Sequence, residues 1–274
     1  MSDITIISSG KKRAVHFVYP AFPAVILTSF FRIGGSGLAN CLFVYAKAIV
    51  EANRRNLKII APTWFNISIG TYIRHERDKR HYLNLFNHKN ELSGLYQLYL
   101  RLFKRNQILK VEGIDGFFAP LLDNNKIVFD YIYEHIKPER LTSVNAFDFV
   151  NCVAVHIRLG DYNESRRIPF EWYKSKIEQY GHGKKVILFS DGTDEELKPI
   201  LSIDNVKRMH FGSAIADIIA ISRCEFLIGS DSSFSAWGAF LGQVPCCFYR
   251  LEFGTVLLDN RKQIIEHPNY FQDL

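Results

Sequence analysis

The second half of the sequence alternates short apolar runs with amphipathic stretches of helical length, and this alternation restricts the fold more than any other feature. Five runs predict buried strands, at Cys152–Ile157, Lys185–Ser190, Val206–His210, Phe226–Gly229 and Val244–Tyr249. The stretches between them predict helices, at Pro169–Tyr180, Asp194–Leu201, Ala214–Ser222 and Phe234–Gly242. Strands that alternate with helices in this way form an open, doubly wound parallel sheet. Because ligands of such sheets bind beyond the carboxyl ends of the strands, we expect function there.

The first half contains one more unit of this kind. The apolar run Ala24–Phe30 predicts a strand, and the glycine cluster at residues 34–37 predicts a turn after it. A helical pattern follows from Ala39 to Asn56, and Leu57–Ala61 predicts the next strand. The sequence thus predicts an α/β protein with two Rossmann-like domains and mostly parallel sheets, divided into residues 1–145 and 146–274.

A further helix in the first half is predicted by apolar residues at helical spacing: Leu92, Leu95, Tyr96, Tyr99, Leu102 and Phe103. Arg101, Lys104 and Arg105 flank this stripe. Two interpretations stay open. The stripe either packs into the core, or lets the helix lie on a membrane surface.

The composition indicates an ordinary globular protein, with 47% hydrophobic and 23% charged residues among 274. No C-x-x-C spacing occurs, and the cysteines lie in apolar runs, so we expect reduced core residues at Cys41, Cys152, Cys224, Cys246 and Cys247. No apolar stretch reaches the roughly 18 to 20 residues that cross a bilayer, and no signal peptide is recognisable. These features predict a cytoplasmic protein.

The net charge of +6 is unevenly distributed. Residues 1–137 hold 19 Lys and Arg against 10 Asp and Glu, whereas residues 138–274 hold 15 against 18. A basic half suits anionic lipid headgroups, a lipid diphosphate or nucleic acid, or is simply a solvated basic face. The sequence has no helix-turn-helix, RRM or zinc motif, so nucleic acid is not expected. Peripheral contact with the inner face of a membrane remains the expectation.

The first group of chemically interesting residues follows the strand at 152–157. His156 and Arg158 are two residues apart and therefore point to the same face. A guanidinium is a planar fork of donors that can bond two oxygens of a diphosphate and neutralise the charge of a leaving group. The alternative is an Arg158–Asp161 salt bridge that merely closes the loop.

The second group follows the strand at 226–229. Here Ser232 and Ser233 directly precede an apolar helix. Either serine is a good N-cap, and the exposed N–H groups of a first helical turn form an anion site. A helix cap without a ligand is the alternative. The two groups together predict a diphosphate held between Arg158 and this helix start.

These residues resemble a known family, the α-1,2-fucosyltransferases of glycosyltransferase family 11, within a fucosyltransferase superfamily of GT-B fold. Residues 156–162, HIRLGDY, are similar to its motif H-x-R-R-G-D-Y. Asp217 and Cys224, followed by residues 232–241, SSFSAWGAFL, are similar to D…C…S-S-F-S-W-W-G-A-W-L. Residues 37–46, GLANCLFVYA, resemble R-L-G-N-Q-M-F-Q-Y-A.

The resemblance implies an inverting, metal-independent transferase that uses GDP-fucose as donor and needs no cofactor. Residues 1–145 would form the acceptor side and residues 146–274 the sugar-nucleotide-binding domain. The donor-binding residues it implies are His156, Arg158, Asp191, Ser232, Ser233, Phe234 and Asn40, with Asp191 near the nucleotide base. Four positions depart from the motifs. In the first motif segment Ala39 stands where the family has glycine, and Cys41 stands where it has glutamine. Leu159 replaces the second arginine, which removes a positive charge near the phosphates, and Gly192 replaces the second aspartate after Ser190.

In an inverting transfer the acceptor hydroxyl attacks the anomeric carbon while the nucleoside diphosphate leaves, so the developing phosphate charge must be stabilised. Arg158 is assigned this catalytic role. Asp161 and Glu164, in the following loop, are the candidates for a general base. The acidic run that contains Asp191 and Asp194 is interpreted as the start of a helix rather than as a metal site. No Cys/His set has zinc spacing.

Other functions remain open at this point. The same fold could bind a nucleotide or glycan without turnover, an alternative that the missing second arginine keeps in view, or use another nucleotide sugar. For the acceptor, the basic first half suggests a growing surface glycan on a lipid diphosphate at the cytoplasmic membrane face.

Overall fold

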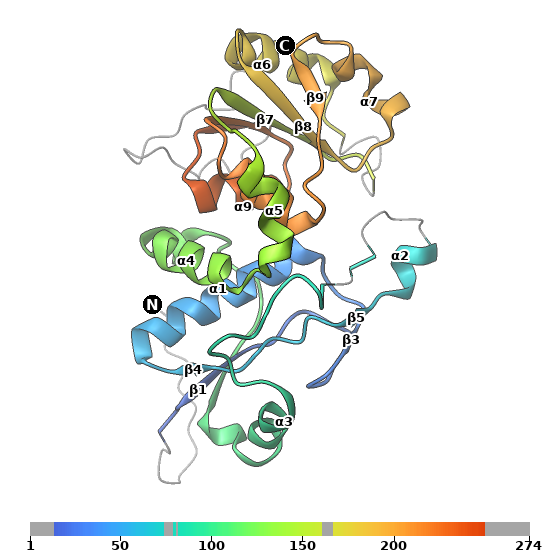
Figure 1. Ribbon diagram of the computed structural model, residues 1–274. Coiled ribbons are helices and arrows are strands. Elements are labelled where there is room, and N and C mark those ends of the chain that lie inside the picture. Colours follow the sequence, from blue (N-terminus) through green and yellow to red (C-terminus); the bar gives the residue numbers. More distant parts are fainter. Residues whose placement is uncertain (1–13, 74–78, 81, 161–166, 250–274) are drawn as a thin grey trace.

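The computed structural model describes residues 14–73, 79–80, 82–160 and 167–249. They form an α/β protein in which most strand pairs are parallel, as predicted. Figure 1 shows the two main sheets at opposite ends of the molecule with a layer of helices between them. The fold class expected from the alternating pattern is therefore confirmed.

The larger sheet comes from the second half and has the order β11-β10-β7-β8-β9, with every pair parallel. Its strands are β7 (Cys152–Ile157), β8 (Lys185–Ser190), β9 (Val206–Arg208), β10 (Phe226–Gly229) and β11 (Cys246–Phe248). The chain runs outward from β7 to β9 and then returns to the other side of β7. The strand order therefore reverses between β7 and β10, where such sheets open a crevice.

Helices cover both faces of this sheet: α6 (Phe170–Gly181), α7 (Asp194–Leu201), α8 (Ala214–Ile221) and α9 (Ser233–Gly242). Alternate residues of β7 serve the two faces, as the period of a strand requires. Cys152 and Ala154 pack in the core that contains α8 and α9, whereas Val153 and Val155 pack in the core that contains α6 and α7. Burial on both faces explains why every residue of β7 is buried and why all but His156 are apolar.

The smaller sheet has the order β4-β1-β6 and is also parallel. It consists of β1 (Phe17–Pro20), β4 (Lys58–Ile59) and β6 (Ile108–Val111). Helix α1 (Leu38–Arg55) packs on one face, and α3 (Gly94–Phe103) contributes to the core on the other. The remaining helices are α2 (Ile69–Ile73), α4 (Asn125–His135) and α5 (Pro138–Ala146), with the short 3₁₀ helices η1 (Arg105–Gln107) and η2 (Ala119–Asn124).

The strand predicted at Ala24–Phe30 is wrong as part of the parallel sheet. The strand that precedes α1 in the parallel unit is β1, and the predicted run instead enters a small separate sheet. That sheet consists of β2 (Ile26–Leu27), β3 (Arg32–Ile33) and β5 (Asn66–Ile67). Pro20 is the last residue of β1 and Pro23 precedes β2. Because proline cannot donate to a strand ladder, the parallel strand does not continue into the run at 24–30. A Cβ on Gly35, whose φ is +91°, would lie 1.9 Å from the Pro23 carbonyl oxygen, so the close turn after β3 requires glycine.

A single hydrophobic core joins the two halves. Helices α1, α4 and α9 pack against one another between the sheets. The Trp237 indole N–H on α9 donates to the Ala39 carbonyl oxygen at the start of α1, at 2.7 Å. The Trp237 ring also contacts Phe43 and Phe118. The predicted boundary at 145/146 coincides with the end of α5 and stays a prediction.

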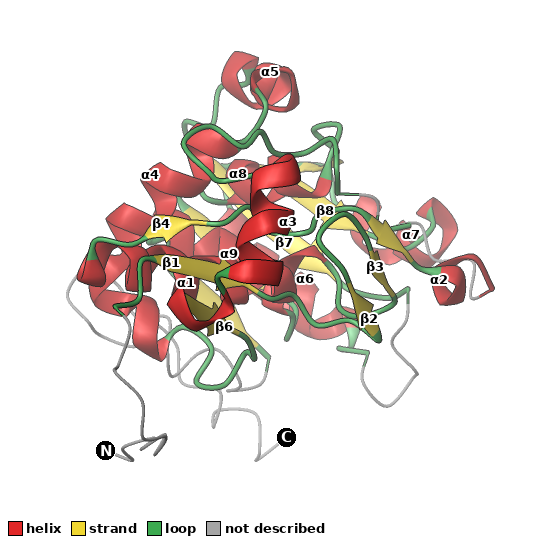
Figure 2. Cartoon of the chain, turned by 90° about the horizontal axis from the view of Figure 1, so that it is seen from below, coloured by secondary structure: helices red, strands yellow, loops and turns green. Residues whose placement is uncertain are grey.

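The helix predicted from the apolar stripe at 92–103 exists as α3, but most of its stripe does not enter the core. Figure 2 views the molecule from the end at which α3 lies. Leu100 and Gln97 are buried, whereas Leu95, Tyr96, Tyr99, Leu102 and Phe103 are exposed. Of the two interpretations, core packing of the stripe is thus wrong for most of its residues.

The five cysteines are buried and free, in agreement with their prediction as core residues. Among the residues that the structure describes, no helix is long and apolar enough to cross a membrane.

Candidate functional site

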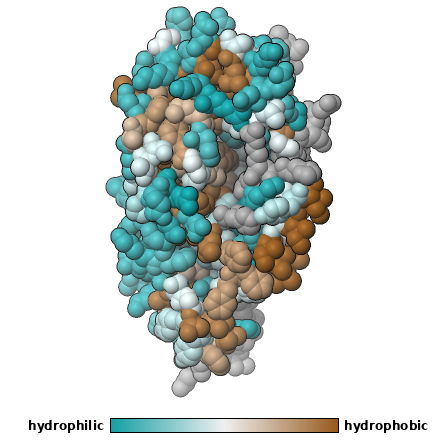
Figure 3. Space-filling model, turned by 45° about the vertical axis from the view of Figure 1, so that its right-hand side comes forward, coloured by the Kyte–Doolittle hydropathy of each residue, from teal (hydrophilic) through white to brown (hydrophobic). Residues whose placement is uncertain are grey.

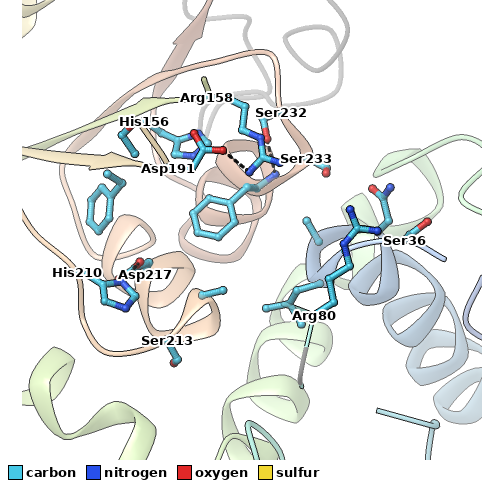
Figure 4. Close-up of a pocket in the computed structure, with 18 of the residues that line it drawn as sticks. Ser36, Arg80, His156, Arg158, Asp191, His210, Ser213, Asp217, Ser232 and Ser233 are labelled. Atoms are coloured by element: carbon cyan, nitrogen blue, oxygen red, sulfur yellow. Dashed lines mark hydrogen bonds and ion pairs between the residues drawn. The ribbon is translucent and has the colours of Figure 1, made fainter. Parts of the chain in front are cut away.

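A cavity of about 860 Å³ lies where the two halves meet, beyond the carboxyl ends of β7, β8 and β10. Figure 4 shows how side chains from both halves face it. From the first half it is lined by Gly35, Ser36, Gly37, Leu38, Ala39, Asn40 and Arg80. From the second half it is lined by His156, Arg158, Phe189, Ser190, Asp191, Arg208, Met209, His210, Ser213, Ala214, Asp217, Ser232, Ser233 and Phe234. The described donor-binding residues that the sequence predicts therefore share one cavity.

Arg158 lies immediately after β7 and forms an ion pair with Asp191, which follows β8. Its Nη1 is 2.9 Å from Asp191 Oδ2, and Asp191 Oδ1 accepts the Leu159 N–H at 2.8 Å. A Cβ on Gly160 would lie 2.6 Å from Asp191 Oδ2, so glycine at this position lets the carboxylate approach. The resemblance placed Asp191 near the nucleotide base. In the structure its carboxylate holds the Arg158 guanidinium in the cavity, and its position relative to a nucleotide base stays a prediction.

Two of the four departures from the family motifs, Leu159 and Gly192, are neighbours in the structure. Leu159 is buried and does not line the cavity, because it points to the opposite side of the chain from Arg158. A Cβ on Gly192 would lie 2.6 Å from Leu159 Cδ1. Leu159 therefore occupies the space beside Gly192 that an aspartate side chain would need. The Leu159 side chain itself does not line the cavity, and the expectation that it removes a positive charge from the phosphate site stays a prediction.

His156 closes the floor of the cavity and is almost fully buried. Its ring stacks on Phe234 with 4.9 Å between the centroids, and its Nδ1 is 2.5 Å from Ser235 Oγ and 2.9 Å from Ser230 Oγ. Burial lowers the pKa of His156 to about 4, an effect that Asp191 opposes and Arg158 reinforces. The imidazole is therefore neutral near pH 7 and ties β7 to the start of α9.

Helix α9 begins at the cavity. Ser232 is its N-cap, and the Ser232 hydroxyl accepts the Phe234 N–H at 3.2 Å. The first N–H groups of a helix point out of its N-terminus and carry part of the positive end of the helix dipole. Figure 4 shows Ser232 and Ser233 beside the Arg158 guanidinium. The convergence of Arg158 and this helix start, predicted from the sequence, is thus present.

A second helix start faces the same cavity from the first half. Helix α1 begins after Gly37, which offers no side-chain cap, and Asn40 lies in its first turn. Arg80 donates from Nη1 to the Gly35 carbonyl oxygen at 2.6 Å and lines the cavity beside this loop. The sequence analysis did not identify Arg80, because it lies within a mixed-charge run that is typical of a solvated surface. Only the tertiary fold brings it to the site.

The other end of the cavity has a different chemistry. His210 Nδ1 lies 2.7 Å from Asp217 Oδ2 on α8, and Asp217 Oδ1 accepts the Phe211 N–H at 2.7 Å. The hydrogen bond to Asp217 raises the pKa of His210. In Figure 4 this pair and Ser213 lie apart from Arg80 and Ser36. Asp217 belongs to a quoted motif, but neither it nor His210 was identified as a site residue.

The candidates for a general base, Asp161 and Glu164, lie outside the described residues. The acidic run after Asp191 does start a helix, as predicted. Thr193 caps α7, its hydroxyl accepts the Glu196 N–H, and Glu196 accepts the Thr193 N–H in return. Asp194 pairs with Arg208, another cavity residue. Among the described residues no three His, Cys, Asp or Glu side chains are grouped as metal ligands.

Comparisons with known proteins agree with this geometry. Residues 117–245 match the family model described as glycosyl transferase family 11. That span runs from η2 through α9 and contains Arg158, Asp217 and the serines of α9. The resemblance seen in the motifs is confirmed over this part of the chain, and with it the prediction of a glycosyltransferase. A search of curated proteins finds no match.

Among solved structures, the fold is similar to fucosyltransferase NodZ from Bradyrhizobium, with a TM-score of 0.51 and 12% identity. The similarity covers 87% of this chain and 96% of that one. A structure of NodZ alpha-1,6-fucosyltransferase soaked with GDP-fucose has a TM-score of 0.50 and 13% identity, and covers 83% and 92%. At these identities the likeness concerns the fold, which extends over both halves of the chain.

Proposed function

Taking as premise that residues 117–245 are those of a family 11 glycosyltransferase, we propose that the chain transfers fucose from GDP-fucose to a hydroxyl group of a glycan. The reaction we propose is inverting and metal-independent, and it needs no cofactor beyond the donor. The donor assignment is supported by the fold likeness to a fucosyltransferase whose crystals were soaked with GDP-fucose.

The observation that carries the proposal is the convergence of positive groups on one cavity. Arg158, Arg80 and the starts of α9 and α1 all face it, and its volume of about 860 Å³ lies within the usual range for small-molecule sites. A diphosphate carries negative charge that helix starts and guanidinium groups bind favourably. The proposed donor site is therefore this cavity, with the diphosphate between Arg158 and Ser233.

The same groups give the proposed mechanism. As the bond between the anomeric carbon and the diphosphate oxygen breaks, negative charge grows on the leaving group. Arg158 is already held by Asp191, and the helix N–H groups are fixed by the backbone, so little reorganisation is needed to stabilise that charge. Asp161 or Glu164 would accept the proton of the attacking hydroxyl; that assignment is a proposal from their positions in the sequence.

The nucleoside would occupy the other end of the cavity. Asp217 and Asp191 are the carboxylates among the described lining residues, and Asp191 is engaged with Arg158. Asp217 is therefore the carboxylate there best placed to accept N–H groups of a base such as guanine. We propose that residues 146–274 bind most of the donor, with Arg80 and the start of α1 contributing from the first half, and that residues 1–145 face the acceptor.

The acceptor we propose is a growing surface glycan on a lipid diphosphate, used by a cytoplasmic enzyme at the inner face of the membrane. The basic charge of the first half supports an acidic or membrane-associated acceptor. Free oligosaccharides that serve as well as lipid-linked ones would contradict this part of the proposal.

A non-catalytic binding protein was the main alternative, and the absence of the second arginine was the reason to consider it. Leu159 packs beside Gly192 and does not line the cavity, which supports a donor site that functions without the second arginine. The remaining alternative is a transferase that uses another nucleotide sugar. The nucleotide that the protein binds most tightly distinguishes this alternative from a GDP-fucose-dependent enzyme.

Two measurements test the proposal. Thermal shifts with GDP, UDP, ADP and CMP should show stabilisation by GDP only, by about 3 kcal/mol at a concentration one hundred times the dissociation constant. Release of GDP from GDP-fucose should then require a glycan acceptor. Stabilisation by UDP alone would reject the fucosyl donor, and GDP binding without turnover on any acceptor tested would favour a binding protein.

A further inference from the structure

Helix α3 presents large apolar side chains to solvent on the outer face of the β4-β1-β6 sheet. Leu95 is 79% exposed and Phe103 is 70% exposed, and Tyr96, Tyr99 and Leu102 on the same helix are also exposed. Figure 3 shows apolar side chains gathered over the lower part of the molecule, the level at which Figure 1 places α3. Exposed apolar groups collected on one helix indicate a surface that contacts something less polar than water.

The attachment of α3 to the rest of the protein leaves this surface free. The core beneath the helix contains four buried residues, Tyr19, Ala21, Ile60 and Leu100, and only Leu100 comes from α3. Gln97 anchors the helix through its Nε2, which donates to the Ala61 carbonyl oxygen at 2.9 Å. The buried side of α3 thus consists of Gln97 and Leu100, and the exposed residues of the stripe are not part of that core.

A basic pocket lies directly beside the exposed stripe. It has a volume of about 530 Å³ and is lined by Tyr19, Thr28, Ser29, Leu98, Arg101, Leu102, Arg105, Ile108 and Lys110. These lining residues include three cations and three hydroxyl groups but no carboxylate. One wall is the turn between β2 and β3, on which Phe30 is exposed, so apolar groups flank the pocket on two sides.

The cations of this pocket are only partly neutralised. The Arg101 guanidinium lies over the Tyr19 ring, 4.5 Å from its centroid, and its Nη1 is buried without a hydrogen-bond partner among the described residues. Arg105 Nε donates to the Arg101 carbonyl oxygen. Lys110 pairs with Glu112 at 2.5 Å, and both side chains are exposed. Residues 93–112 contain four Lys and Arg and one acidic residue, Glu112, so this stretch carries a net positive charge.

We propose that α3 and the turn between β2 and β3 dock this protein on an anionic phospholipid bilayer. The side chains of Leu95, Leu102 and Phe103 enter the boundary between headgroups and acyl chains, and a lipid phosphate occupies the pocket beside Arg101. A helix of this kind lies in the plane of the membrane, with its apolar face inward and its cations at headgroup level. The Tyr96 and Tyr99 rings, stacked at 6.0 Å, suit the interface because they are amphipathic.

The combination of features favours a bilayer over a protein partner. A positive pocket set within an exposed apolar surface complements a layer of anionic headgroups above acyl chains. Each Lys or Arg near an anionic surface contributes roughly 1 kcal/mol, and the contribution falls with added salt. This inference concerns a face distinct from the donor cavity and does not depend on the proposed reaction.

The test is flotation of the full chain with vesicles, first of phosphatidylcholine alone and then with about a third phosphatidylglycerol. The variants are Leu95→Ser with Phe103→Ser for the apolar face, and Arg105→Gln with Lys110→Gln for the pocket. All four side chains are exposed, so the variants should fold, which circular dichroism and thermal unfolding check. Matched controls are Leu83→Ser with Val150→Ser, and Arg54→Gln with Arg55→Gln, which are exposed residues elsewhere.

We expect binding to the anionic vesicles that weakens with salt and is at least about tenfold weaker in either test variant, since each removes two favourable contributions. The control variants should bind as the unchanged protein does. Absence of binding, equal binding to uncharged vesicles, or equal loss in test and control variants would overturn the proposal. Self-association that disappears in Leu95→Ser with Phe103→Ser, without vesicle binding, would assign the face to a second copy of the chain.

Discussion

The pair formed by Leu159 and Gly192 provides a direct test of how the site departs from the family 11 motifs that it resembles. We expect Leu159→Arg alone to destabilise the protein by about 3–5 kcal/mol, because residue 159 is 3% exposed and a guanidinium there would be buried without a partner. Gly192→Asp alone should cost about 1–3 kcal/mol, because its Cβ would lie 2.6 Å from Leu159 Cδ1 and force that side chain to move.

The double change should recover a large part of this loss. With both substitutions the guanidinium gains a carboxylate where Leu159 now contacts Gly192, so the two effects should couple favourably by about 2 kcal/mol or more. The assay is urea unfolding at pH 7 of the unchanged protein, both single variants and the double variant. Gly192→Ala is the control for added volume, because it introduces the Cβ without a charge and should not rescue Leu159→Arg.

Two results of these experiments would contradict the placement of Leu159 beside Gly192. If residue 159 faced the diphosphate, Leu159→Arg would leave the stability unchanged and strengthen GDP binding in the thermal-shift assay. Strictly additive losses in the double variant would show that residues 159 and 192 do not interact. The first result would place residue 159 at the donor site and reopen the case for a non-catalytic binding protein, and the second would contradict the contact between residues 159 and 192.

Three further predictions concern the cavity. Arg158→Ala should abolish transfer with little change in the unfolding temperature, and Asp191→Asn should lower kcat/KM less severely by releasing the guanidinium; steady-state kinetics with GDP-fucose measure both. The neutral His156 should stabilise the fold fully above pH 6.5 and lose this contribution, roughly 3 kcal/mol, as the pH falls from 6.5 to about 4. His156→Gln should therefore unfold with a weaker pH dependence over that range, as urea titrations at several pH values would show. Asp217→Asn should raise KM for the donor about tenfold or more with a smaller change in kcat, whereas a fall in kcat alone would indicate a catalytic role for the His210–Asp217 pair.

The secondary structure of the second half could be predicted from the sequence because the apolar pattern of each segment agrees with its position in the folded sheet. The bounds predicted for β7, β8, α7 and β10 are those observed, since each strand is a continuous apolar run closed by a polar turn. Arg158 and Ser232 were found for the same reason, because residues that follow strands of a parallel sheet must meet at one edge. In this half the candidate site residues therefore lie at the sheet edge that the order of strands and helices predicts.

In the first half, prediction from the apolar pattern fails in two places. The apolar run at 24–30 looked like the strand of a parallel unit, but apolar character does not say which sheet a run joins. The stripe on α3 predicted a helix correctly, yet periodicity does not say whether an apolar face meets a core or another medium. The burial of Leu100 and the exposure of Leu95 and Phe103 are decided by packing alone.

Several residues of the site were beyond sequence reasoning for a related physical cause. Arg80 enters the cavity because the chain after α2 passes the loop at Gly35, and no local pattern encodes that contact. His210 can be recognised as a site residue only from its hydrogen bond to Asp217 on α8, which the sequence does not show. The role of Asp191 was assigned to the nucleotide base from a motif, whereas the distance to Arg158 was needed to reveal the ion pair.

The helix starts of α1 and α9 explain why both halves are needed for one anion site. They belong to different halves, yet the Trp237 N–H of α9 bonds to the Ala39 carbonyl oxygen in the first turn of α1. Trp237 is fully buried among aromatic rings, so this contact fixes the two starts relative to each other within the core. A dipole that is fixed before the donor arrives stabilises developing charge without the cost of reorientation. The packed core between the sheets is therefore part of the proposed phosphate site, because it sets the direction of the groups that face the diphosphate.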